Sequence, residues 1–188
     1  SGPRGVLGEL FVHLMSVLTL DVKYHRYQAI LNLKQEIRDD IYPQASLVSM
    51  SLAGILRNLM VKRLESSFFA FKRTLSNVAK ATERMIAMFA NDKVFIAPDF
   101  DVNALMEKGF TMEEVENYIL ERTLDQPDSR NRIFPASDFE PDFLTGLQSD
   151  LELLNDLISK WHNIEEDPKL EKFFDALKNE FLRTSLNP

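Results

Sequence analysis

The clearest pattern of apolar positions runs from Leu64 to Phe89. Apolar residues recur there at alternating spacings of four and three, and Thr82 fills the one remaining slot. No glycine or proline interrupts the chain between Ile55 and Phe89. The spacing therefore predicts an amphipathic helix with one apolar stripe, the seam, which faces a core. The seam comprises Leu64, Phe68, Phe71, Leu75, Val78, Met85 and Phe89.

This helix is predicted to begin near Ser46 and to end near Asn91. Unbroken, it would be about 68 Å long at ~1.5 Å per residue, so we expect part of it to protrude from a domain of this size. The apolar positions before Met60 face about 100° or more away from the seam. Either the helix bends near Met60, or its two halves pack against different partners.

Apolar periodicity predicts six further helices, over residues 6–17, 21–38, 101–108, 111–122, 141–163 and 167–183. Residues 18–22 are predicted as a strand or a turn, and residues 92–100 as a connector with a short extended piece. Residues 124–139 form a polar stretch with two prolines, which predicts a flexible loop. The whole pattern predicts a single helical domain over residues 1–188, an all-α bundle built around the long helix.

Composition narrows the function classes. Hydrophobic residues make up 45% of the chain and charged residues 27%, which argues against disorder. Cysteine is absent, which excludes disulfides and thiolate catalysis and fits a reducing, cytoplasmic location. No apolar run approaches the ~20 residues of a membrane span, so we expect no membrane partner.

Charge is distributed unevenly and singles out a second stripe on the long helix. The net charge is −7, yet residues 1–98 carry 13 basic against 8 acidic side chains. Lys62, Arg73, Lys80 and Arg84 fall within a narrow arc opposite the seam. These cations form either a solvated face with salt bridges to the acidic second half, or a surface that contacts phosphates without reading base sequence.

Catalytic motifs are absent from the sequence. The chain lacks a glycine-rich phosphate loop, a GxSxG elbow, an HExxH pair and an EF-hand loop. His13, His25 and His162 lie in separate predicted helices, which favours ordinary helix histidines over a metal site. Trp161 and the phenylalanines follow apolar helix faces, so we expect them in the core, with stacking on a nucleic-acid base as the alternative. We therefore expect no catalytic residue, metal or cofactor in this chain.

Two segments carry a resemblance to a known family. The first is LRNLMVKRLESSFFAFKRTL, Leu56–Leu75, with Lys62-Arg63-Leu64-Glu65-Ser66-Ser67 at its centre. The second is Asp167-Pro168-Lys169-Leu170, at the start of the last predicted helix. In this order they resemble the region between the two motor lobes of bacterial Swi/Snf-type superfamily-two helicases, in the group that often carries a phospholipase-D-like nuclease domain.

The resemblance implies a helical insertion rather than a motor, because the lobes' phosphate loop, acidic box and arginine-bearing motifs are missing here. The parent protein would couple ATP hydrolysis, with Mg, to movement on DNA or RNA. The insertion would have the flanking motor lobes as partners and would touch the phosphate backbone. The expected contacts are Lys62, Arg63, Arg73, Lys80 and Arg84. The competing class is a helical protein-interaction module, which would expose a large apolar patch.

Overall fold

The structure is a computed structural model, which describes residues 3–43, 54, 58, 60, 62–63, 68–96, 108–109, 114, 132–162, 172, 175–176 and 179. The fold is all-α, as predicted, with one small two-stranded sheet. Its helices are α1 (Pro3–Ser16), α2 (Gln35–Ile41), α4 (Phe68–Ala90) and α7 (Asp142–His162). A π-helical turn, Val17–Asp21, follows α1 directly, and 3-10 turns cover His25–Gln28, Ile30–Asn32 and Ala136–Asp138.

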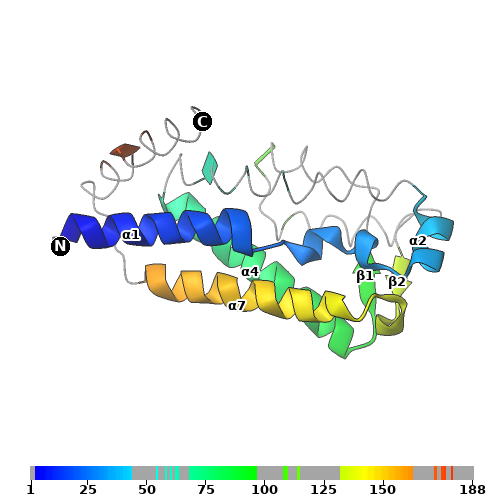
Figure 1. Cartoon of the computed structure of the whole chain (residues 1–188). Coiled ribbons are helices and arrows are strands. Elements are labelled where there is room, and N and C mark those ends of the chain that lie inside the picture. Colours follow the sequence, from blue (N-terminus) through cyan, green and yellow to red (C-terminus); the bar gives the residue numbers. More distant parts are fainter. Residues whose placement is uncertain are drawn as a thin grey trace.

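Helices α1, α4 and α7 form the body of the molecule (Figure 1). α1 and α7 run in opposite directions, while α4 crosses behind them and makes its most extensive contact with α7. The predicted helix over residues 141–163 is confirmed almost to the residue. The apolar positions that recur along it at helical spacing form its core face, since Phe143, Leu147, Leu154, Leu157 and Trp161 are buried.

The seam predicted on the long helix is buried along α4. Phe68, Phe71, Leu75, Val78, Thr82 and Met85 are all buried, and Phe89 packs partly buried against the core. Thr82 keeps its hydroxyl satisfied in the seam by donating to the carbonyl oxygen of Val78, at 2.9 Å. α4 ends at Ala90, close to the predicted Asn91. Leu64 and the predicted start near Ser46 lie outside the described residues.

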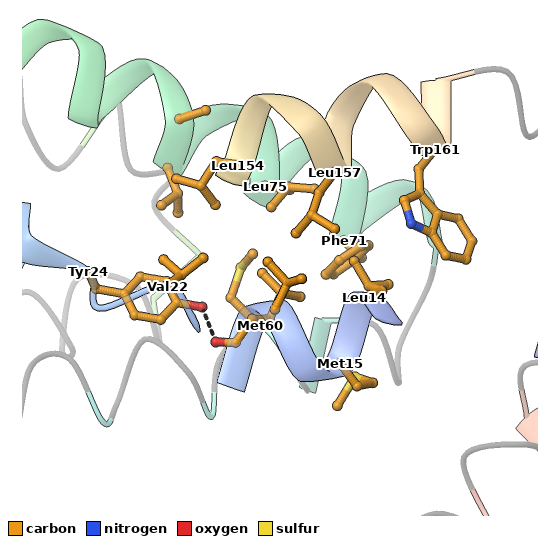
Figure 2. Close-up of a cluster of buried hydrophobic side chains, with 14 of the residues drawn as sticks. Leu14, Met15, Val22, Tyr24, Met60, Phe71, Leu75, Leu154, Leu157 and Trp161 are labelled. Carbon is orange, nitrogen blue, oxygen red and sulfur yellow. Dashed lines mark hydrogen bonds between the residues drawn. The ribbon is translucent and has the colours of Figure 1, made fainter. Parts of the chain in front are cut away.

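The core has two parts. The first joins α1, α4 and the second half of α7, where Leu14, Met60, Phe71, Leu157 and Trp161 meet (Figure 2). Met60, where we expected a bend or a change of partner, lies in the same cluster as the seam residues from Phe68 to Val78. The second part lies at the other end of the bundle and includes Leu33, Met85, Val94, Phe134, Phe139, Phe143 and Leu147.

The predicted helix over residues 21–38 is wrong. The chain there is broken into the two short 3-10 turns, an extended Leu33–Lys34 and α2. Tyr24 adopts a left-handed conformation, with φ of 55°, which no α-helix contains. The strand or turn expected at residues 18–22 is a π-helical turn instead, and Thr19 donates to the carbonyl of Met15 there.

The loop predicted over residues 124–139 contains regular structure where it is described. β2 (Arg132–Phe134) pairs antiparallel with β1 (Val94–Ile96), and Val94 lies opposite Phe134. Phe134 and Phe139 are buried, so this stretch closes the second part of the core. Asp92, just after α4, accepts a hydrogen bond from the backbone N–H of Ala136 at 2.8 Å.

The remaining predicted helices fall mostly outside the described residues. Glu114 and Lys172 are described as helical, within the stretches predicted as helices over 111–122 and 167–183. Gly109, directly after the helix predicted over 101–108, lies in a turn with φ of 91°, a conformation that favours glycine.

Candidate nucleic-acid interface

Three of the five predicted site residues lie on one face of α4. Arg73, Lys80 and Arg84 are all exposed, and helix geometry places them within an arc of about 40°, opposite the buried seam. We call these three residues the basic stripe. Lys62 is exposed and Arg63 half-buried, both in helical conformation before α4. The structure therefore brings together the α4 members, and it keeps Arg63 more enclosed than the others.

The electrostatics of α4 favour an anionic partner. Residues 68–90 contain four cations, Lys72, Arg73, Lys80 and Arg84, against a single acid, Glu83. Because Arg73, Lys80 and Arg84 lie on one face of this helix, their potentials add over the same surface. α7, which packs against the seam, has the opposite balance, with four acids and one lysine. The positive surface therefore belongs to the outer side of α4, away from α7.

Salt bridges do not account for two of the three residues of the basic stripe. Among the described residues, Arg73 and Lys80 form no ion pair; the pairs found there join His25 to Asp150, Arg38 to Asp39, and Lys160 to Asp156. Lys72 behaves differently, because its ammonium lies 5.2 Å from the ring centroid of Phe68. That contact turns Lys72 away from the basic stripe and towards the first part of the core.

An aromatic residue also lies in the basic stripe. Phe69 is 61% exposed, although the phenylalanines on either side of it in the seam, Phe68 and Phe71, are buried. It precedes Arg73 by four residues, so the two side chains occupy the same face of α4. We expected the phenylalanines in the core, and for Phe69 this is wrong. The signal was present in the sequence, because position 69 falls outside the four-and-three spacing of the seam.

A cation from another segment also approaches α4. The Nε of Arg26 donates to the carbonyl oxygen of Ala81 at 3.0 Å, and its guanidinium lies 5.1 Å from the ring centroid of Tyr27. Ala81 directly follows Lys80 in α4 and is buried, so the Arg26 charge lies against α4 at the level of Lys80. Sequence reasoning missed this residue, because it placed Arg26 inside a helix that does not form.

The second polar cluster, His25 with Asp150, fits a structural role better than a catalytic one. Asp150 of α7 is buried, and one of its oxygens lies 2.9 Å from His25 Nδ1. The other ring nitrogen, Nε2, faces α7, where a Cβ added at Gly146 would lie only 2.5 Å away. A histidine serving as a general base needs its outer nitrogen open to a substrate, and here that nitrogen lies against the backbone of a helix.

No metal site is found in the part of the chain that the structure describes, since no three His, Asp or Glu side chains there converge as ligands. His13 lies apart from His25 and contacts the Nζ of Lys160 at 3.2 Å. A shallow hollow of about 480 Å³ occurs near α2, lined by exposed side chains of both charges: Lys34, Gln35, Glu36, Asp39 and Glu140. Within the described ranges, no helix is long and apolar enough to cross a membrane.

Comparison with known proteins identifies no relative of this chain. No protein family, curated protein or solved structure matches the chain. The basic stripe, with Phe69 within it, is therefore the feature on which a functional proposal can be built.

Proposed function

We propose that this chain contacts a nucleic-acid backbone through the basic stripe of α4, as the helical insertion between the two motor lobes of an ATP-dependent helicase or translocase. The observation that carries the contact role is the exposure of Arg73, Lys80 and Arg84 on one face, opposite the buried seam residues Phe68 to Met85. Lys and Arg spaced along a straight helix neutralise phosphates without reading bases. The motor assignment rests on the sequence resemblance over Leu56–Leu75 and Asp167–Phe173.

In this proposal the chain itself is not an enzyme. The flanking lobes of the parent protein bind ATP and Mg, and the helical bundle orients them relative to the strand. α4 suits such a role because its seam packs against α7 and shares the first part of the core with α1. A force that the nucleic acid exerts on the basic stripe would therefore be transmitted to the whole bundle. A basic helix face on an acidic protein also steers a polyanion to one surface and away from the rest. A cytoplasmic location follows from the same proposal.

Binding to short oligonucleotides tests the contact role. The chain is titrated into fluorescein-labelled DNA or RNA at low salt, and anisotropy is recorded for the wild type and for Arg73→Gln/Lys80→Gln/Arg84→Gln. We expect at least about a tenfold loss of affinity in the triple variant, because three phosphate contacts are removed. Lys34→Gln is the matched control, since Lys34 is an exposed lysine outside α4.

Two results would overturn this proposal. Absence of binding by the wild type at low salt excludes a backbone contact by the isolated bundle. Equal binding by the triple variant shifts the contact away from α4 and leaves the second class, a protein-interaction module. That class would expose one large apolar patch. The large exposed apolar side chains of the described residues instead lie on three different parts of the fold: Val12, Leu20, Phe69 and Ile133.

The gene encoding the parent protein tests the motor assignment separately, through a phosphate loop before this segment and an arginine-bearing motif after it.

A further inference from the structure

We propose that Phe69 is a stacking platform for an unpaired base, so that the basic stripe binds single-stranded nucleic acid in preference to duplex. The inference rests on the proposed backbone contact and names the form of nucleic acid that this contact selects. It starts from the position of one side chain. Phe69 is 61% exposed on α4, while Phe68 is 4% and Phe71 0% exposed.

An exposed phenylalanine alone would need no explanation, because apolar atoms contribute much of any protein surface. The surroundings distinguish this one. Phe69 and Arg73 are separated by one helical turn, and Lys80 and Arg84 continue along the same face. Burying a phenylalanine side chain normally stabilises a fold, and this chain leaves the ring of Phe69 exposed instead. An exposed aromatic ring beside cations fits a partner that carries both negative charge and flat aromatic groups, as the phosphates and bases of a nucleic acid do.

The spacing along α4 fits a strand that lies lengthwise on the helix. At about 1.5 Å per residue, Arg73 lies ~6 Å beyond Phe69 along the axis, Lys80 ~16 Å and Arg84 ~22 Å beyond it. A strand could therefore place one base on the ring while its next phosphates meet the three cations in turn. Aromatic stacking combined with a basic track is how proteins bind single strands without sequence preference.

A duplex cannot use the ring in this way. Its base faces are covered by their neighbours in the stack, and only base edges are open in the grooves. Taking a base out of a duplex requires unstacking and unpairing it, whereas the bases of a single strand are already unpaired. The cations contact phosphates of either form, whereas the ring contributes only when a base is unstacked. Phe69 should therefore control the ratio of the two affinities, and the basic stripe should control both together.

Four variants at one position test this inference. The chain carrying Phe69→Ala, Phe69→Leu, Phe69→Tyr or Phe69→Trp is titrated against a labelled oligo(dT) of about 12 nucleotides and against a duplex of the same length, within the ~4–16 nucleotide range of single-strand sites. We expect Phe69→Ala and Phe69→Leu to weaken single-strand binding about 5- to 100-fold and to leave duplex binding within about twofold. Tyr and Trp should retain the single-strand affinity, because each keeps an aromatic face.

The Phe69→Trp variant gives a direct readout of stacking. The chain has one tryptophan, Trp161, which is buried, so its background signal can be subtracted using the wild type. We expect oligo(dT) to quench the fluorescence of the introduced indole and the duplex to leave it unchanged. Each variant is first checked for wild-type helicity by circular dichroism.

The outcomes separate this inference from the proposal beneath it. If Phe69→Ala binds both forms like the wild type while the Arg73/Lys80/Arg84 triple variant loses both, the stacking role is wrong and the backbone contact stands. If Phe69→Leu binds single strands like the wild type, the ring supplies apolar bulk only, which also overturns stacking. If the wild type binds neither form, both the contact and the stacking role are wrong.

Discussion

The Nδ1 of His25 and the Oδ2 of Asp150 lie 2.9 Å apart, although 125 positions separate the two residues in the chain. The same carboxylate accepts hydrogen bonds from the backbone N–H groups of Lys23, at 2.9 Å, and of His25, at 2.7 Å. Asp150 thus satisfies the backbone on both sides of Tyr24, whose left-handed conformation costs about 1–2 kcal/mol. The hydroxyl of Tyr24 donates to the carbonyl of Leu18, which holds the turn from its other side (Figure 2).

Asp150 should therefore stabilise the folded state. We expect Asp150→Ala to lower the free energy of unfolding by about 3 kcal/mol, because two backbone N–H groups and the His25 ring lose a buried, charged acceptor. Asp156→Ala is the matched control on the same helix: Asp156 is exposed and pairs only with Lys160, so its loss should cost under about 0.5 kcal/mol. Urea denaturation followed by circular dichroism measures both. Equal, small losses in the two variants would contradict the assigned role of Asp150.

Gly146 and Gly8 should respond in opposite directions to the same substitution. Glycine to alanine in a helix normally stabilises by about 1 kcal/mol, and Gly8 in α1 has open space for a Cβ. At Gly146 the Cβ would come within 2.5 Å of His25 Nε2, and the ring cannot move away without losing Asp150. We expect Gly8→Ala to raise the thermal midpoint and Gly146→Ala to lower it.

A double-mutant cycle separates this clash from other effects. In a His25→Ala background the ring is gone, so Gly146→Ala should lose most of its cost and approach the behaviour of Gly8→Ala. If Gly146→Ala destabilises equally in both backgrounds, contact with His25 is not the cause.

Phe71 and Phe69 allow a comparison within a single helix. Phe71 is fully buried in the seam, so Phe71→Ala should cost about 3–5 kcal/mol through lost contacts and a cavity. Phe69→Ala removes an exposed ring and should change the unfolding free energy by less than about 0.5 kcal/mol. Chemical denaturation of the two variants measures the difference. A large loss for Phe69→Ala would mean that this ring packs inside the fold in solution.

The sequence predicted best where local periodicity sets the structure. The seam of α4 and the core face of α7 each follow from helical spacing, since residues three and four apart share a face. The same geometry predicted that Arg73, Lys80 and Arg84 would lie on the opposite side, and all three are exposed there. Periodicity predicts only that these three residues share an exposed face. The partner that binds there remains a prediction.

The failures lie where distant residues determine the local structure. Residues 21–38 have helical spacing, but Asp150, more than a hundred positions away, binds the backbone of Lys23 and His25 in a non-helical turn. β2 lies in a stretch rich in polar residues and prolines, and it becomes a strand because Val94 and Phe95 supply its partner. Arg26 reaches α4, and His25 reaches α7, because contacts with these distant helices determine the turn around both residues. A sequence pattern that spans ten residues or fewer cannot predict such contacts.

Glu83 offers a gain-of-function test of the electrostatics. It is the only acid of α4, and it lies three residues after Lys80 and next to Arg84 in sequence. Glu83→Gln removes a charge that repels phosphate, so we expect affinity for oligonucleotides to rise about two- to threefold at low salt and the gain to disappear at high salt. Glu152→Gln, an exposed acid on α7, is the control and should have no effect. A gain of the same size in both variants would mean that overall charge, not the surface of α4, governs binding.

The most direct test of the central claim is the salt dependence of binding. A protein that neutralises phosphates of a single strand shows a slope of log affinity against log salt of about −0.7 per contact. We predict that Arg73→Gln/Lys80→Gln/Arg84→Gln makes this slope for oligo(dT) shallower by about 2, and that Lys34→Gln leaves it unchanged. An identical slope for the wild type and the triple variant would contradict the claim that the outer face of α4 holds the nucleic-acid backbone.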